Sequence, residues 1–174
     1  MKLASERKYT QSALNLYGGD IDITPSSGER PQPLTADEEA FLRALTRVIY
    51  ALPKAMEADL EREARMSLSE YMTLVLLSEA RCRAMRMSEL AEAASSSLSG
   101  MTHIVSRLQD QGLVARVRCE GDGRGWNAVL TDAGLARLNE AWPANVTSVR
   151  RHLLDHLGGL DLGSLAKAFY NVAS

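Results

Sequence analysis

Residues 108–134 read LQDQGLVARVRCEGDGRGWNAVLTDAG, and this stretch decides the fold. An apolar repeat with helical spacing ends at Gly112, and glycine commonly follows the end of a helix. The pattern then alternates over residues 113–119, which predicts a strand. Three closely spaced glycines predict a hairpin tip, and residues 126–130 predict the return strand. Thr131 is placed to cap a further helix, so the stretch predicts a helix, a hairpin and another helix.

Two short helices and a turn precede this stretch. Ser67 or Ser69 is placed to cap the first helix, and Ser88 to cap the second, predicted over residues 88–94. The three serines at 95–97 predict a tight turn before the third helix. Two helices, a turn, a longer helix and a hairpin form a winged helix-turn-helix. The expected fold class is therefore mainly helical.

Long helices flank this arrangement. A capping box of Thr35 and Glu38 predicts the start of one, whose apolar positions continue past Pro53 with a kink. The other is predicted from residue 132 to the glycine pair 158–159, followed by a short last helix. Both carry more apolar positions than this chain can readily bury alone, which predicts a two-fold dimer. The predicted domains are an arm and linker (1–34), a helical dimerisation region (35–66 and 132–174) and a winged helix-turn-helix domain (67–131).

The composition fits a globular DNA-binding protein without a membrane segment. The 174 residues are 45% hydrophobic and 24% charged, with a net charge of −2. No apolar run approaches the ~20 residues of a membrane span, and no secretory signal is visible, so a cytoplasmic location is expected. Two cysteines make no disulfide framework. Residues 81–124 carry seven arginines against five acidic residues, which supplies the local basic patch that nucleic-acid binding requires.

The helix before the hairpin has a small, polar N-terminal face that can enter the major groove and meet base edges. Arg107 is expected to meet a phosphate. Arg124 lies at the predicted hairpin tip and can enter the minor groove, with Asp122 holding its guanidinium group. The predicted major-groove residues are Ser97, Ser99, Gly100, Thr102 and His103.

With these motifs the chain resembles the MarR family of bacterial transcription regulators, over about residues 35–174. The similar segments are the helix-to-strand junction Leu108–Arg116, the wing motif Asp122-Gly123-Arg124, the helix start Leu130–Gly134, and the segments Arg86–Ala91 and Ser97–His103. The resemblance implies a triangular homodimer, with intertwined terminal helices, bound to double-stranded DNA at a pseudo-palindromic operator. It also implies a repressor that a small ligand, often a phenolic acid, or thiol oxidation releases.

An effector pocket is expected where the long helices meet the winged domain, since ligands favour such junctions. A small aromatic acid needs a cation and an aromatic wall, and Arg47, Tyr50 and Tyr71 are candidates for these roles. A surface arginine and core tyrosines explain the same residues. No cofactor and no enzymatic activity are expected, because no convergent set of acid and base residues is visible.

Other functions stay open. Cys82 and Cys119 lie near arginines that could lower a thiol pKa, which makes a redox-sensing regulator an alternative. An architectural protein that binds DNA without sequence preference is another. His152 and His156 are four residues apart on one predicted helix, a spacing that can bind zinc. A structural zinc site needs about four ligands and no other cluster is visible, so a polar side of the dimer helix is the preferred explanation.

Overall fold

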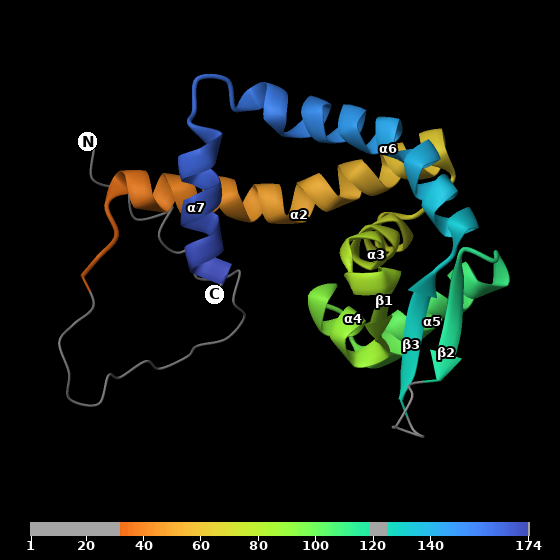
Figure 1. Cartoon of the computed structure of the whole chain (residues 1–174). Coiled ribbons are helices and arrows are strands. Elements are labelled where there is room, and N and C mark those ends of the chain that lie inside the picture. Colours follow the sequence, from red (N-terminus) through yellow and green to blue (C-terminus); the bar gives the residue numbers. More distant parts are fainter. Residues whose placement is uncertain (1–31, 119–124, 174) are drawn as a thin grey trace, which may run out of the picture. The chain divides into compact units, whose positions relative to one another are not determined.

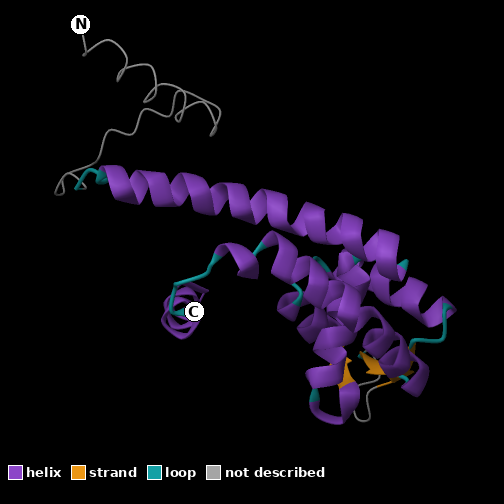
Figure 2. Ribbon diagram, turned by 90° about the horizontal axis from the view of Figure 1, so that it is seen from above, coloured by secondary structure: helices purple, strands orange, loops and turns teal. Residues whose placement is uncertain are grey.

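The computed structural model describes residues 32–118 and 125–173 (Figure 1). Residues 41–174 form one compact unit, which holds all the elements below apart from the start of the first described helix. This part is mainly helical with one small sheet, which confirms the predicted fold class (Figure 2). None of the described helices is long and apolar enough to cross a membrane. Residues 1–31 of the predicted arm lie outside the described residues.

The first described helix, α2 (Ala36–Ala64), begins at the predicted capping box. The Thr35 backbone amide donates to the Glu38 carboxylate at 2.7 Å, and the Glu38 amide donates to the Thr35 hydroxyl at 3.3 Å. These bonds satisfy amides that have no partner within the helix. The bond from the Thr35 amide, together with one from the Thr35 hydroxyl at 3.0 Å, lowers the pKa of the Glu38 carboxyl. α2 continues through Pro53 as one helix, as its apolar pattern predicted.

A second capping box starts α3 (Leu68–Glu79). The Glu70 amide donates to the Ser67 hydroxyl at 3.2 Å, and the Ser67 amide donates to the Glu70 carboxylate at 3.0 Å. Of the two serines that the sequence offered, Ser67 is therefore the cap.

The prediction that Ser88 caps the next helix is wrong. That helix, α4 (Met87–Ala93), starts one residue earlier, so Ser88 lies inside its first turn. The Arg86 amide donates to the Glu89 carboxylate at 3.3 Å. A glutamate in the first turn thus satisfies the amide before the helix, and no capping hydroxyl is needed.

The helix that decides the fold, α5 (Leu98–Asp110), begins and ends as predicted. Ser97 is its N-cap, because its hydroxyl accepts from the Gly100 amide at 3.0 Å. Gly112 follows the helix with a φ of +72°, a left-handed conformation that suits glycine. The chain turns there into the sheet.

The sheet has three antiparallel strands in the order β1-β3-β2: β1 (Ala84–Arg86), β2 (Val114–Arg118) and β3 (Trp126–Leu130). β2 and β3 are the predicted hairpin strands, and Arg116 pairs with Ala128 in their register. Residues 121–124 of the predicted hairpin tip (121–125) lie outside the described residues. The sequence did not predict β1, because three residues are too few to show an alternating pattern.

Thr131 caps α6 (Asp132–His152) as predicted, with its hydroxyl accepting from the Gly134 amide at 2.9 Å. The same hydroxyl donates to the Leu113 carbonyl oxygen at 3.0 Å, which ties the start of α6 to the sheet. A Cβ atom at Gly134 would lie 2.1 Å from that carbonyl oxygen, so the close approach requires glycine here.

The prediction that this helix extends to Gly158–Gly159 is wrong. α6 ends at His152, where Leu153 leaves helical geometry (φ −136°), and a single 3₁₀ turn, η3 (Leu154–His156), follows. Such short turns are common at helix ends. The last helix is α7 (Leu162–Ala173).

One apolar core joins the helix-turn-helix to the sheet and to the adjacent ends of α2 and α6. Figure 1 shows α3, α4 and α5 gathered against the strands. The largest fully buried apolar side chains are Leu60, Tyr71, Leu74, Leu77, Leu90, Met101, Val105, Leu108 and Val114. This core fixes the orientation of α5.

Candidate nucleic-acid interface

α5 has an apolar face and a polar face. The predicted apolar stripe is Met101, Ile104, Val105 and Leu108; three of these are fully buried, and Ile104 is half-buried. Ser99, Thr102 and His103 are exposed and form what we call the polar face of α5. Small polar groups on an exposed helix face are suited to hydrogen bonds with base edges.

The structure gives Gly100 and Thr102 additional roles. A Cβ atom at Gly100 would lie 3.0 Å from the Ser96 hydroxyl and 3.2 Å from the Ser97 hydroxyl, so the capping turn itself favours glycine. The Thr102 hydroxyl donates to the Leu98 carbonyl oxygen at 2.7 Å. Its proton is therefore used inside the helix, and its oxygen remains available as an acceptor.

Arg107 has a partner that sequence reasoning missed. Its guanidinium group forms an ion pair at 2.7 Å with Glu70, whose side chain is almost completely buried at the start of α3. The contact ties α5 to α3 across 37 positions of sequence. A phosphate contact by Arg107 stays a prediction, and any such contact must be made while the guanidinium group neutralises Glu70.

Asp122 and Arg124, the predicted wing residues, lie outside the described residues. The strands that lead to them carry two further arginines. The Arg118 guanidinium group lies over the Trp126 ring at 5.3 Å from its centre, a cation–π contact. Arg116 donates from Nη2 to the Thr102 carbonyl oxygen at 2.8 Å. Sequence reasoning missed both contacts, because alternation alone does not say what a strand packs against.

Of the three effector candidates, Arg47 and Tyr50 lie one helical turn apart on α2, and no contact of either with Tyr71 is found among the described residues. Tyr71 is 2% exposed and belongs to the core, whereas Tyr50 is 69% exposed and Arg47 is exposed on α2. Burial raises the pKa of the Tyr71 hydroxyl, with a smaller opposing effect from Asn145. The alternative explanation, a surface arginine and a core tyrosine, fits Arg47 and Tyr71.

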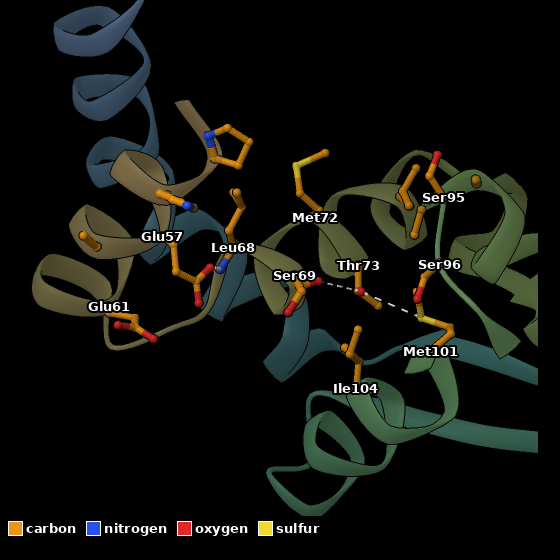
Figure 3. A pocket seen from close by; sticks show the side chains of 16 residues that line it. Glu57, Glu61, Leu68, Ser69, Met72, Thr73, Ser95, Ser96, Met101 and Ile104 are labelled. Atoms are coloured by element: carbon orange, nitrogen blue, oxygen red, sulfur yellow. Dashed lines mark hydrogen bonds between the residues drawn. The ribbon is translucent and has the colours of Figure 1, made fainter. Parts of the chain in front are cut away.

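A cavity of about 850 Å³ lies between α2, α3 and the turn into α5 (Figure 3). It is lined mostly by apolar groups, and its charged residues are Lys54, Glu57 and Glu61. Glu57 accepts from the Leu68 amide at 2.6 Å, which fixes its carboxylate at the start of α3. None of the three effector candidates lines this cavity.

A charged cluster joins α2 to the end of α6. The Asp59 carboxylate pairs with Arg62, with Arg151 at 3.2 Å and with His152 at 2.9 Å. The bond from Arg62 has the largest effect in holding the pKa of Asp59 at about 2, with smaller contributions from Ser148 and His152. His156 instead bonds the Arg151 carbonyl oxygen at 3.0 Å, so the two histidines have different partners.

The cysteines do not define a site in the described residues. Cys82 is exposed in a 3₁₀ turn with a φ of 57°. Cys119 lies outside the described residues. Redox sensing therefore stays an untested alternative.

A helix-turn-helix with an exposed polar third helix and a following strand pair defines a winged helix-turn-helix protein. A model of the MarR family matches residues 66–125. Sco3205, a MarR family transcriptional regulator from Streptomyces coelicolor solved in complex with DNA, is 36% identical, with 82% of this chain and 90% of that chain covered and a TM-score of 0.73. AbsC, a MarR family regulator from the same organism, is 39% identical, with 82% and 95% covered and a TM-score of 0.72. No curated protein sequence matches the chain.

The chain therefore belongs to the MarR family, and these findings support a DNA-binding transcriptional regulator. BldR from Sulfolobus solfataricus shares the fold at 20% identity, with 80% of this chain and 98% of that chain covered and a TM-score of 0.69.

Proposed function

We propose that the protein is a homodimeric repressor that binds a pseudo-palindromic operator, with α5 in the major groove and the hairpin tip in the minor groove. The observation that carries this proposal is the exposed polar face of α5 above a mostly buried apolar stripe. The proposed DNA-contacting residues are Ser97, Ser99, Gly100, Thr102, His103, Arg107, Asp122 and Arg124. The complex of Sco3205 with DNA supports the same use of the shared fold.

A competition experiment tests this function. A duplex selected from a random pool by repeated binding to the protein is titrated against an unselected duplex at several salt concentrations. A regulator binds the selected duplex at least ~10³-fold more tightly. Equal affinities would instead indicate an architectural protein. Placing the selected sequence between a promoter and a reporter gene then tests repression, because an activator raises the reporter signal.

The dimer is supported by apolar side chains that stay exposed in the single chain. They are Phe41, Leu42, Val48, Ile49 and Tyr50 on α2, Trp142 on α6, and Phe169, Tyr170 and Val172 on α7. A second copy covering these helices would bury well over ~2,000 Å², as obligate dimers do. Sedimentation should give a dimer at micromolar concentration, and Ile49→Glu should shift it toward monomer. A wild-type monomer would contradict the proposal.

The effector site that the structure supports is the cavity between α2, α3 and the turn into α5. Its one cation, Lys54, is outnumbered by Glu57 and Glu61, so an aromatic acid would place its carboxylate beside two others. The lining instead favours an apolar molecule that is neutral or positively charged. A ligand there touches both a long helix and the helix-turn-helix, and it weakens DNA binding only if it prefers one arrangement of the two.

Calorimetry with tetraphenylphosphonium and with salicylate separates the two ligand classes. The cation should bind and lower the DNA affinity, whereas salicylate should do neither. Glu61→Gln should weaken binding of the cation, and Glu79→Gln, an exposed change outside the cavity, should not. Binding of salicylate alone would restore the aromatic-acid hypothesis.

A further inference from the structure

Arg116 bridges the two parts of the molecule that are proposed to contact DNA. It lies on β2, and its Nη2 donates to the backbone carbonyl oxygen of Thr102 at 2.8 Å. Thr102 lies on the polar face of α5, one turn after the start of the helix. The bond therefore connects a strand that leads into the hairpin tip with the helix proposed to enter the major groove.

The bond crosses a part of the molecule where the strand pair and α5 are not closely packed. A hollow of about 390 Å³ lies between the tip-side half of the β2–β3 pair, the first turns of α5 and the start of α4. Leu98, Thr102, Arg116 and Trp126 line it, and Leu98 and Trp126 are both substantially exposed. Side-chain packing is therefore incomplete here. The hydrogen bond across the hollow fixes the position of β2 relative to α5, which packing alone does not.

The guanidinium group is held in place rather than free to reach a phosphate. Arg116 is half-buried, and its Nε is shielded from solvent without an acceptor among the described residues. A permanently charged guanidinium group also forms a stronger bond to a carbonyl oxygen than a neutral donor does. Among the described residues, Arg118 makes no such bond to α5. It stacks on Trp126 instead.

We propose that Arg116 is a positioning residue for sequence-specific DNA binding: it fixes the middle of strand β2 against α5, so that the hairpin and α5 fit one operator at once. It acts through Thr102 and the strand pair and makes no DNA contact of its own. The inference rests on the proposed function, because it assumes that α5 and the hairpin bind the same duplex.

The test compares Arg116→Gln, Arg116→Lys and the control Arg118→Gln, which removes one charge from the same strand. Each variant is titrated by fluorescence anisotropy against the selected duplex and an unselected duplex at four salt concentrations. Arg116→Gln should bind the selected duplex at least tenfold more weakly, with an unchanged salt slope and little change on the unselected duplex. Arg116→Lys should recover part of the loss, because an ammonium group can still donate to the carbonyl oxygen.

Three results would overturn the proposal. A salt slope that falls by about one, with equal losses on both duplexes, would make Arg116 a phosphate contact. Unchanged binding to both duplexes would make the bond irrelevant. Equal losses with an unchanged slope and a lowered melting temperature would make Arg116 a general stabilising residue. The proposed function fails separately, when the wild-type protein itself does not discriminate between the duplexes.

Discussion

His103 and Arg124 are expected to act on DNA in different ways. His103 is exposed on the polar face of α5, where it can meet a base edge. His103→Ala should lose discrimination at one or two base pairs, at roughly 1–3 kcal/mol per position, if it reads a base. Titration against single-base variants of the selected duplex measures this loss. Unchanged discrimination at every position would mean that His103 does not read a base.

Arg124→Ala should weaken binding to all duplexes alike and reduce the salt slope by about one, because one counterion-releasing contact is lost. The same titrations, repeated over several salt concentrations, give this slope. Unchanged affinity across the panel would mean that the hairpin tip does not touch DNA.

Asp59 predicts a pH dependence of stability. Its pKa is about 2 in the folded protein against an ordinary 3.8, chiefly because Arg62 bonds the ionised carboxylate. A carboxylate with a lowered pKa stabilises the fold above its unfolded pKa, and this contribution is lost as the pH falls from about 4 toward 2. Asp59→Asn should therefore lower the urea midpoint clearly at pH 7 and about half as much at pH 3, where the folded-state carboxyl is still mostly ionised.

Asp155→Asn, an exposed change on the turn after α6, is the matched control and should have little effect at either pH. A difference between Asp59→Asn and wild type that is equally large at pH 7 and pH 3 would contradict the role assigned to the ionised carboxylate.

Sequence patterns predicted which side chains are exposed on α5 but not what holds the helix in place. Arg107 with Glu70, Arg116 with Thr102 and Asp59 with Arg151 are separated by 37, 14 and 92 positions. Helical periodicity carries no information about partners at such distances. Residue type alone also did not show that Tyr71 is buried in the core whereas Arg47 and Tyr50 are exposed on α2, and none of the three lines the cavity.

Elements were predicted where a local bond defines them. The capping boxes at Thr35 and Ser67 and the caps at Ser97 and Thr131 are all formed by hydrogen bonds within four residues. β1 depends on pairing with β3, which is distant in sequence, so the local pattern missed it. The start of α4 is the exception: a local bond from the Arg86 amide to Glu89 defines it, but the nearby Ser88 was taken as the cap. The sequence also did not predict that α6 ends at His152, because the next residue, Leu153, is not a glycine.

Gly134 tests how tightly α6 is attached to the sheet. A Cβ atom there would lie 2.1 Å from the backbone oxygen of Leu113, so Gly134→Ala must displace the helix or the strand and should cost about 1–3 kcal/mol. Gly158→Ala, which meets nothing within 4 Å, is the control and should be nearly neutral. Urea unfolding of both variants measures the difference. Equal stability of the two would show that this contact is looser than described.

At the scale of the whole molecule, the proposed dimer connects two features. It would cover the exposed apolar side chains of α2, α6 and α7 and leave the polar face of α5 free to meet DNA. Two-fold symmetry would bring a second α5 to the same side of the dimer, and a palindromic operator mirrors that symmetry. Composition and periodicity already indicated that the terminal helices carry more apolar positions than one chain can bury. A pocket was expected where the long helices meet the winged domain; the cavity lies between α2, α3 and the turn into α5, and no residue of α6 lines it.

Dimethyl sulfate footprinting of the selected duplex tests the central claim, that α5 enters the major groove and the hairpin tip the minor groove. The reagent methylates guanine N7 in the major groove and adenine N3 in the minor groove. We expect two patches of N7 protection, centred about one helical turn (~10 base pairs) or a multiple of it apart, with N3 protection in the minor groove beside each patch. Specific binding without protection of N7 would contradict the account.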